Sequence, residues 1–321
     1  MSRVAVLGAG AWGTAIGAVL SSRLEVTLWA RDPVQAGRLA SSRRNERYLP
    51  GIELPDALGI TPQFEKAING AALILAATPV AGLREIAHKL PADAPLVWLC
   101  KGFEEGTGLL PHQLVAQKRS GALSGPSFAD EVARGLPCAL TLASRDEGFA
   151  RDAAALLHGG RLRVYYSADL VGVEIGGAVK NVMAIAAGIS DGLGLGYNAR
   201  AALITRGLAE IARLGAALGA STETIFGLTG AGDLILTATG DLSRNRRVGL
   251  QLAQGAPLPK ILEQLGHVAE GVYPAREVAK LARAKGVEMP VTDAVNAVLE
   301  GKLAPKAAVE QLLSRDPKQE R

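Results

Sequence analysis

The stretch VLGAGAWGTA, from Val6 to Ala15, decides the fold of this chain. It follows a short apolar run of strand type at residues 3–7 and opens a run of helical type. Gly8 permits a tight turn, Gly10 lets a pyrophosphate approach the backbone, and Gly13 allows close packing of the helix on the strand. Glycines at this spacing between a strand and a helix predict a dinucleotide-binding turn. The alternative is a glycine-rich turn without a ligand.

Segments of strand and helix type alternate around this turn through the first half of the chain. The expected strands cover residues 3–7, 24–30, 71–77, 96–100, 121–124, 138–143 and 162–166, and the first two expected helices cover 11–22 and 33–42. Apolar runs of strand length suit strands that are covered on both faces. We therefore predict an α/β fold in which residues 1–168 form a Rossmann-type, doubly wound parallel sheet.

The pattern becomes helical from residue 169 to residue 321, which predicts an all-α C-terminal domain. Residues 201–218 carry an apolar stripe at helical spacing. A stripe of this kind is the face that a helix buries. Arg206, Glu210 and Arg213 fall outside the stripe, so we expect them to pair along the surface.

Bulk composition excludes several classes of protein. Lys and Arg number 35 against 31 Asp and Glu, which gives a formal charge of +4, and the basic runs are short. We therefore expect no nucleic-acid partner. Cys100 and Cys138 stand alone without partner spacing, which favours a reducing compartment. Glycines interrupt the apolar N-terminus and Pro79 interrupts residues 71–83, so we expect a cytoplasmic protein without membrane insertion. We also expect no metal site.

The end of the second expected strand bears on the choice of nicotinamide cofactor. An acidic residue is expected there to hold the ribose of NAD. Asp32 comes slightly late, and Arg31 precedes it. An arginine beside the adenine ribose suits the 2′-phosphate of NADP. We predict that NADPH is accepted, and the alternative is that Arg31 is a solvated loop charge.

Two polar segments follow later strands of the expected sheet. Lys101 comes directly after residues 96–100, and ligands of open α/β sheets bind outside the carboxyl ends of the strands. A lysine there is well placed to meet an anion or a carbonyl oxygen. In Ser124–Asp130 a strand end turns into a helix, where free amides and the Ser127 hydroxyl can face a polar ligand. Ordinary helix capping by Ser127 is the alternative.

The most informative residues are Lys180 and Asn181, because they lie in the nearly all-apolar segment 171–189. A lysine buried in such a helix needs an explanation. Gly176 and Gly177, one turn earlier, are expected to leave room above the lysine for a ligand. A partly desolvated lysine titrates closer to neutrality and can act as acid and base. The alternative is a lysine whose stem extends to the surface.

Two further segments carry polar groups that suit a phosphorylated substrate. A glycine loop leads to Asp233 and Thr237, which share a face of a helical turn. After it, Asp241 or Ser243 can cap a helix whose first turn carries the arginines of 244–247. A helix N-terminus with arginines is a good site for a dianion such as phosphate. The alternative is a non-specific basic turn on the surface.

Together, these pieces resemble the bacterial NAD(P)-dependent glycerol-3-phosphate dehydrogenases. The resemblance runs over nearly the whole chain, through GAGAWGTA, LWARDP, RRNERYLPG, the Lys101-Gly102 pair, GPSFA, AVKNVMAIAAGI, TGAGDLILTAT, SRNRRVG and VAEGV. It implies a dinucleotide domain over residues 1–168, a helical substrate and dimerisation domain over 169–321, and a homodimer. One departure is Val80, where many members have a serine that would make a polar contact near the cofactor.

The resemblance also implies roles for individual residues. Lys180 is expected to be the catalytic acid and base, and the other expected catalytic residues are Lys101, Asn181, Asp233 and Thr237. The expected substrate contacts are Lys101, Gly125, Ser127, Lys180, Asp233, Ser243, Arg244 and Asn245. The expected cofactor contacts are Gly8, Gly10, Ala11, Trp12, Gly13, Arg31, Tyr48, Lys101, Ala129, Arg244, Val268 and Glu270. The flat ring of Trp12 would lie against the dinucleotide, and the alternative is a core residue between helix and sheet.

The reaction implied by the resemblance is hydride transfer from NADPH or NADH to the C2 carbonyl of dihydroxyacetone phosphate. The product, sn-glycerol 3-phosphate, would serve glycerophospholipid synthesis. Two alternatives stay open at this point, because fold alone excludes neither. A β-hydroxyacid or ketopantoate-type reductase shares the fold and the lysine but needs no phosphate site such as 243–245. A nucleotide-sensing protein without turnover shares the glycine turn.

Overall fold

A computed structural model describes residues 2–265 and 272–316 of the chain. The chain divides into two compact units. The first comprises Met1–Glu104 and Leu109–Glu174, and the second comprises Glu105–Gly108 and Ile175–Arg321. The contacts change from one unit to the other inside the long helix α7 (Leu170–Gly192), a few residues beyond the boundary predicted after residue 168.

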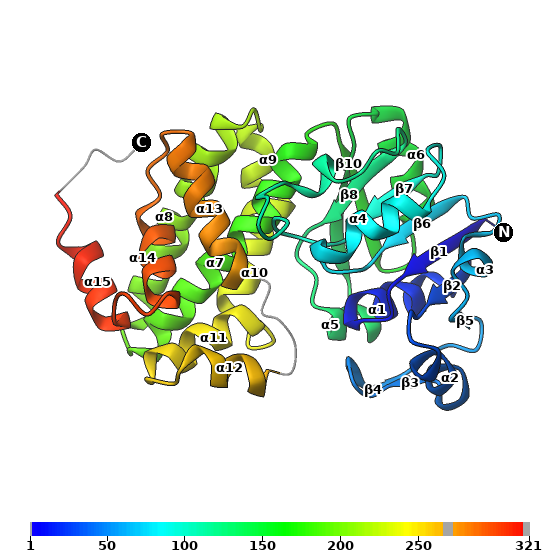
Figure 1. Cartoon of the computed structure of the whole chain (residues 1–321), viewed down its shortest axis with the longest axis horizontal. Coiled ribbons are helices and arrows are strands. Elements are labelled where there is room, and N and C mark those ends of the chain that lie inside the picture. The colour runs from blue at the N-terminus through cyan, green and yellow to red at the C-terminus, as the bar shows by residue number, and fades with distance from the viewer. Residues whose placement is uncertain (1, 266–271, 317–321) are drawn as a thin grey trace. The chain divides into compact units, whose positions relative to one another are not determined.

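One sheet organises the first unit (Figure 1), with the strand order β10-β9-β8-β7-β6-β1-β2-β5. Its strands are β1 (Arg3–Leu7), β2 (Glu25–Trp29), β5 (Gly59–Thr61), β6 (Leu73–Ala76), β7 (Leu96–Trp98), β8 (Ser120–Ser124), β9 (Cys138–Ala143) and β10 (Leu162–Ser167). A separate hairpin joins β3 (Arg44–Asn45) to β4 (Leu49–Glu53). The predicted Rossmann-type fold is confirmed, since strand order reverses beside β1, between β2 and β6.

The prediction of a parallel sheet is wrong at one strand pair. Strand β8 pairs with β9 in the antiparallel direction, and β10 then follows β9 in parallel. A parallel pair needs a crossover, usually a helix laid across the sheet. The link over residues 125–137 contains only the short helix α5 (Ala129–Ala133), which packs on α1 (Ala11–Leu20). With no helix laid across the sheet, the chain turns back, and β9 runs opposite to β8.

Helices cover both faces of the sheet, as Figure 1 shows for this unit. Alternate residues of β1 point to opposite sides, so Val4 and Val6 lie in one core cluster and Ala5 and Leu7 in another. The first cluster packs against α1, α2 (Pro33–Ser42) and α6 (Glu147–Leu157). The second packs against α3 (Phe64–Ile68), α4 (Val80–Lys89) and the first turn of α7. Burial on both faces explains the continuous apolar runs in the sequence.

The second unit consists of helices in the part of the chain that the structure describes, which confirms the predicted all-α domain. They are the rest of α7, α8 (Gly196–Ala217), α9 (Thr222–Phe226), α10 (Asp233–Thr239), α11 (Arg244–Ala253), α12 (Leu258–Gln264), α13 (Val272–Ala284), α14 (Pro290–Leu299) and α15 (Pro305–Leu313). A π-helical turn, η2 (Leu228–Gly232), precedes α10. Helix α7 is long and apolar enough to cross a bilayer, but 94% of its most apolar window is buried inside the protein.

Glu210 of α8 departs from its expected surface position. The residue is only 1% exposed. Its carboxylate accepts hydrogen bonds from the backbone N–H groups of Val291 and Thr292, at 2.6 and 3.1 Å, and from Thr292 Oγ1 at 2.9 Å. Glu210 therefore caps the first turn of α14, and the prediction that it pairs along the surface is wrong. Burial raises the pKa of this carboxyl to about 7, against the opposing effect of its three donors.

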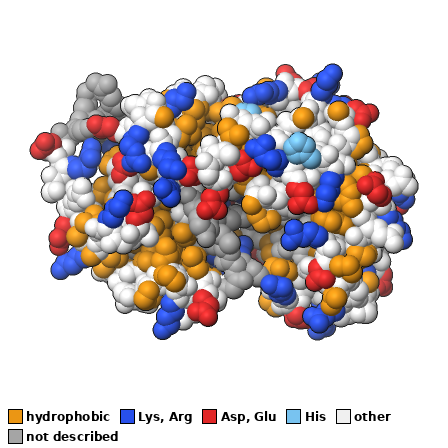
Figure 2. Space-filling view, in the orientation of Figure 1, with side chains coloured by type: hydrophobic (Ala, Val, Ile, Leu, Met, Phe, Trp, Pro, Cys, Tyr) orange, Lys and Arg blue, Asp and Glu red, His pale blue; other side chains and the backbone are white. Residues whose placement is uncertain are grey.

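Charged side chains of both signs are interspersed over the visible face of the molecule (Figure 2). This distribution matches the small excess of basic over acidic residues, 35 against 31. On this face the positive charge is therefore mixed with negative charge instead of being gathered into a stripe.

Candidate active site

The three glycines after β1 have different surroundings. Gly8 has a φ of +121°, and a Cβ there would lie 2.7 Å from the Ala77 carbonyl oxygen after β6. A Cβ on Gly13 would lie 2.0 Å from the Gly8 carbonyl oxygen. Gly10, by contrast, has no neighbour within 4 Å of the position of a Cβ. The turn is thus tightly packed beneath Gly8 and Gly13 and open above Gly10, at the N-terminus of α1.

Two polar side chains brace this turn from outside the motif. Asn45 Nδ2 donates to the Ala9 carbonyl oxygen at 3.1 Å and to Thr14 Oγ1 at 2.7 Å. Gln35 Nε2 donates to the same carbonyl at 3.0 Å. Because these bonds hold the backbone of the turn from behind, its open side stays shaped for a ligand. Trp12 is half-buried and packs against two apolar clusters of the unit.

The open side of the turn fits a dinucleotide. The free amides of the first turn of α1 and the empty space over Gly10 suit a pyrophosphate. At the end of β2, Asp32 is already used, because its Oδ1 accepts from Val34 N at 2.9 Å and caps α2. Arg31 is exposed beside it. The residue expected to hold an NAD ribose is therefore engaged elsewhere, while a cation for a 2′-phosphate is available.

The remaining expected cofactor residues are spread over several elements. Tyr48 lies in the turn of the β3–β4 hairpin with the Arg47 guanidinium 5.0 Å from its ring centre. Ala129 is the first residue of α5. Val268 and Glu270 lie outside the described residues. Val80, the departure from the resemblance, is the first residue of α4 and is 8% exposed.

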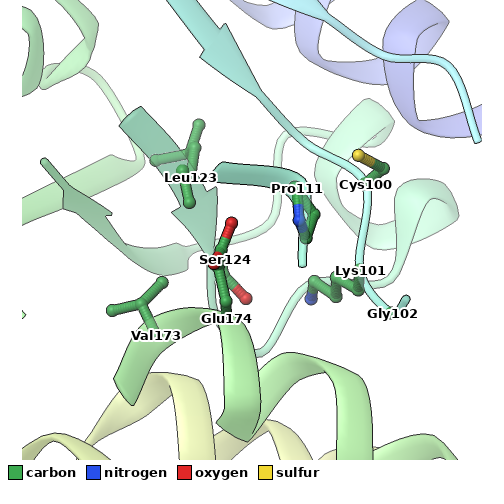
Figure 3. Close-up of a pocket in the computed structure, with 9 residues that line it drawn as sticks. Cys100, Lys101, Gly102, Pro111, Leu123, Ser124, Val173 and Glu174 are labelled. Atoms are coloured by element: carbon green, nitrogen blue, oxygen red, sulfur yellow. The ribbon is translucent and has the colours of Figure 1, made fainter. Parts of the chain in front are cut away.

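Lys101 follows β7 and borders a small pocket in the first unit (Figure 3). Its Nζ donates to the Gly125 carbonyl oxygen at 3.2 Å, and Ser127 Oγ donates to the same oxygen at 3.1 Å. Three residues predicted from two separate segments are thus joined through one carbonyl group. Ser124 Oγ also lines the pocket, and it is buried without a hydrogen-bond partner.

The same pocket is lined by Glu174, which the sequence reasoning missed. Figure 3 shows its carboxyl and the end of Lys101 directed into the same space. Glu174 Oε1 accepts from the His112 backbone N at 2.9 Å, and Oε2 bonds to His112 Nδ1. Burial raises the pKa of the Glu174 carboxyl, and the contacts with His112 oppose that rise. An acidic residue within the apolar start of α7 was the available signal.

Lys180 lies at the centre of a buried polar cluster in the second unit. The residue is 7% exposed, and its Nζ donates to Asp233 Oδ1 at 2.7 Å and to Thr237 Oγ1 at 2.8 Å. Thr237 Oγ1 in turn donates to the Asp233 carbonyl oxygen at 2.6 Å. The charge of the lysine therefore has a buried counter-ion, and Asp233 and Thr237 fix the direction of the ammonium group. This geometry excludes a lysine stem that extends freely to the surface.

Gly176, one turn before Lys180, serves a different purpose from the one expected. A Cβ on Gly176 would lie 2.8 Å from the Thr229 carbonyl oxygen of η2. The space is thus filled by protein backbone, and the prediction that Gly176 leaves room for a ligand is wrong. Close approach of η2 to α7 is what brings Asp233, the next residue after η2, to Lys180. Irregular π-helical turns of this kind are frequent at functional sites.

Asn181 joins this cluster to the N-terminus of α11. Its Oδ1 accepts from Asn245 Nδ2 at 3.0 Å, while its Nδ2 is buried without a partner. Ser243 is the N-cap of α11, and its Oγ accepts from the Arg246 backbone N at 3.2 Å. Arg244, the first residue of the helix, is exposed. The unpartnered Asn181 amide of α7 thus lies on a helix that is hydrogen-bonded to α11, whose N-terminus carries backbone amides and the Arg244 guanidinium.

Comparison with known proteins identifies the family to which this chain belongs. A model of the N-terminus of NAD-dependent glycerol-3-phosphate dehydrogenase matches residues 3–150, and a model of its C-terminus matches residues 169–310. The chain belongs to this family. The resemblance inferred from the motifs is confirmed, and with it an NAD(P)-dependent oxidoreductase that acts on a CH–OH group. The comparisons support this family and not the ketopantoate-type alternative.

Full-length relatives of this dehydrogenase carry the same description. The chain is 59% identical over 326 residues to a glycerol-3-phosphate dehydrogenase (NAD(P)+) of Dechloromonas aromatica, with 99% of each chain covered. It is 58% identical over 327 residues to that of Aromatoleum aromaticum, which covers 99% of this chain and 100% of the relative. A crystal structure of glycerol-3-phosphate dehydrogenase from Coxiella burnetii is 41% identical and superposes with a TM-score of 0.92 over 98% of this chain and 99% of that chain.

Proposed function

We propose that this dehydrogenase reduces dihydroxyacetone phosphate to sn-glycerol 3-phosphate, in a reversible reaction that supplies glycerophospholipid synthesis. When bound, NADPH or NADH supplies the hydride that adds to the C2 carbonyl carbon. The observation that carries the proposal is the buried Lys180–Asp233–Thr237 cluster, in a chain of this family. The reduction adds one hydride to C2 and one proton to the C2 oxygen.

Lys180 is the proposed source of that proton. Its ammonium group protonates the alkoxide that develops at the C2 oxygen, and in the oxidising direction its amine takes the proton back. Asp233 and Thr237 hold the Nζ by two short hydrogen bonds, which fix the direction of the ammonium group. Asn181 and Lys101 are proposed to orient the carbonyl and hydroxyl groups. The buried, unpartnered Asn181 Nδ2 supports this role, because an unsatisfied donor gains most from a ligand acceptor.

The phosphate of the substrate is proposed to bind at the start of α11. Ser243, Arg244 and Asn245 supply a hydroxyl, a guanidinium and an amide there, and the helix N-terminus favours an anion. Gly125 and Ser127 are proposed as further substrate contacts. The proposed division of labour is that residues 1–168 bind the cofactor and residues 169–321 bind substrate and form the homodimer.

The cofactor is proposed to lie over Gly10, with Ala11, Trp12 and the other expected contact residues around it. The proposed set beyond the turn is Arg31, Tyr48, Lys101, Ala129, Arg244, Val268 and Glu270. Arg31 is proposed to favour NADPH, since Asp32 already caps α2. A cytoplasmic location is proposed from the lone cysteines Cys100 and Cys138, which form no disulfide.

The test is the loss of nicotinamide absorbance on addition of dihydroxyacetone phosphate, with NADPH and NADH in parallel. Lys180→Ala should lose at least about 100-fold in kcat, the usual contribution of a general acid. Its binding of NADPH should stay intact. Lys302→Ala is the matched control, because the side chain of Lys302 is 73% exposed and far along the sequence.

The outcomes separate the candidate reactions. Wild-type turnover that collapses only in Lys180→Ala supports both the reaction and the acid. Turnover that survives in Lys180→Ala removes the lysine from its role. No turnover of dihydroxyacetone phosphate with intact NADPH binding would overturn the substrate assignment, and phosphate-free 2-keto and 3-keto acids would then be the substrates to assay.

A further inference from the structure

Helices α7 and α11 meet with almost no side chains between them. A Cβ on Gly188 of α7 would lie 2.0 Å from the Arg246 carbonyl oxygen, and a Cβ on Gly249 of α11 would lie 2.1 Å from the Ile185 carbonyl oxygen. A Cβ on Gly192 would lie 2.6 Å from that of Ala253. The two backbones are therefore in direct contact. Helices packed in this way have a fixed separation, because no flexible side chain can absorb a displacement.

An ion-pair network locks the same crossing. Asp191 of α7 accepts from Arg246 of α11, with 2.9 Å to Nε and 2.7 Å to Nη2, and from Arg200 of α8 at 3.0 Å. Arg246 also pairs with Asp241, at 2.9 Å through Nη1. The side chains of Asp191 and Arg246 are 13% and 12% exposed. A fork-shaped guanidinium held by two carboxylates is directionally constrained and has little capacity left for a third anion.

The periodicity of α7 relates this network to the proposed acid. At about 100° per residue, Asp191 lies within about 20° of Lys180 around the helix axis, three turns further along. Asn181, Gly188 and Gly192 lie within about 40° of one another, on the side that faces α11. Helix α11 is thus attached to α7 at two points, by Asn245 at Asn181 and, about 80° away around the helix axis, by Arg246 at Asp191.

We propose that Asp191 is a positioning residue that, through Arg246 and the glycine crossing, fixes the separation between Lys180 and the phosphate-binding start of α11. The inference rests on the proposed function and deepens it. The fixed separation between Lys180 and the start of α11 matches the distance from the reacting carbonyl to the phosphate of the substrate. It thereby selects the three-carbon phosphorylated ketone. Because Arg246 anchors the helix, the exposed Arg244 at the first position of α11 is the arginine proposed to contact the phosphate.

The test compares two substrates in Asp191→Asn and Asp191→Ala. With dihydroxyacetone phosphate, kcat/KM should fall at least about tenfold, since displacement of a substrate by about 1 Å can cost up to about 100-fold. With dihydroxyacetone, which has no phosphate to be held, kcat/KM should change less than about twofold. Asp152→Asn is the matched control, because its side chain is 74% exposed and pairs with Arg151 in α6 of the first unit, outside the network.

A double-mutant cycle with Arg244→Ala gives the second readout. Once the phosphate contact is removed, the additional loss from Asp191→Asn should shrink to less than about twofold, whereas independent effects would multiply. Equal losses with both substrates, or a full additional loss in the Arg244→Ala background, would mean that Asp191 only stabilises the fold and would overturn the proposal. Unchanged kcat/KM for dihydroxyacetone phosphate would overturn it as well. Absence of turnover in the wild-type enzyme would instead overturn the proposed function itself.

Discussion

At the scale of single residues, the glycine turn separates packing from binding. Gly8 and Gly13 touch backbone within the folded chain, whereas the space above Gly10 is empty. The position of each glycine in the motif predicts this division, and the close contacts of Gly8 and Gly13 agree with it. The sequence alone does not reveal the neighbour of Gly8, because Ala77 follows the end of β6, far along the chain.

This difference predicts opposite effects of the same substitution. Gly10→Ala should fold with unchanged thermal stability but lose at least about tenfold in NADPH affinity, because its methyl group occupies the space for the pyrophosphate. Gly13→Ala should lower the melting temperature, because its Cβ would lie 2.0 Å from the Gly8 carbonyl oxygen. Thermal melting and cofactor titration of both variants check this. A Gly10→Ala protein that binds NADPH normally would contradict the assignment of this space to the cofactor.

Arg31 carries the second prediction at this scale. Arg31→Ala should weaken NADPH by about 1 to 2 kcal/mol, in the range of a charge-assisted hydrogen bond, and leave NADH almost unchanged. Its side chain is exposed, and the neighbouring Asp32 is fixed in the cap of α2. The measurement is the ratio of kcat/KM for the two cofactors. Arg38→Ala, on the exposed face of α2, is the control. An unchanged ratio would remove Arg31 from cofactor selection.

Residues that position other side chains are the hardest to predict from the sequence. Lys180, Asn181, Asp233 and Thr237 stand out in the sequence because polar side chains interrupt apolar or glycine-rich runs. Glu174 and Asp191 interrupt the same helix, yet they gave no motif of their own. Their partners, His112 and Arg246, lie 62 and 55 positions away along the chain. Only the tertiary structure reveals such pairs.

At the scale of elements, strands and helices follow from the sequence more readily than their directions. Strand β9 begins and ends where its apolar run predicts, at Cys138 and Ala143. Its antiparallel pairing with β8 depends on how the preceding link packs, which local pattern does not encode. Glu210 shows the same limit. Its position beside the apolar stripe of α8 predicts a surface residue, but α14 covers it.

The cap formed by Glu210 predicts a dependence of stability on pH. Its pKa is raised from 4.5 to about 7 in the folded chain, so the protonated form is favoured by folding. The resulting stability is fully present below pH 4.5, is lost as the pH rises to about 7, and stays lost above that. The change amounts to at most about 3 kcal/mol.

Urea unfolding of the wild type and Glu210→Gln, at about pH 5 and about pH 8, measures this contribution. The wild type should lose more stability between the two values than the variant, which has no proton to release. Glu263→Gln, an exposed position on α12, should behave like the wild type. Parallel pH profiles for wild type and Glu210→Gln would show that Glu210 stays ionised in its cap.

At the scale of the whole molecule, the sequence resolves a sheet-forming half and a helical half, because hydrophobic periodicity changes between them. The sequence does not reveal which residues near the boundary contact the sheet-forming unit and which contact the helical unit. Residues 105–108, which follow the strand β7 and Lys101, belong to the helical unit, as the contact of Gly108 with Glu277 illustrates. Contact density, and not composition, places them there.

The homodimer is the prediction at this scale. Large apolar side chains remain exposed in the helical unit, among them Tyr197 at 82% and Phe226 at 57%, which association would remove from water. Sedimentation equilibrium should give twice the chain mass of 33.2 kDa. A mass of 33.2 kDa over the whole range of working concentrations would contradict it.

The glycine contact between α7 and α11 also limits how the enzyme can be redesigned. Substrate scope is usually altered by enlarging or trimming side chains that line a site, but this crossing offers none to change. Any replacement at Gly188 or Gly249 adds atoms where backbone oxygens already lie within 2.1 Å. A catalyst for a longer phosphorylated ketone would therefore have to be sought by rebuilding the loop before α11, at residues 240–243, while both helices stay as they are.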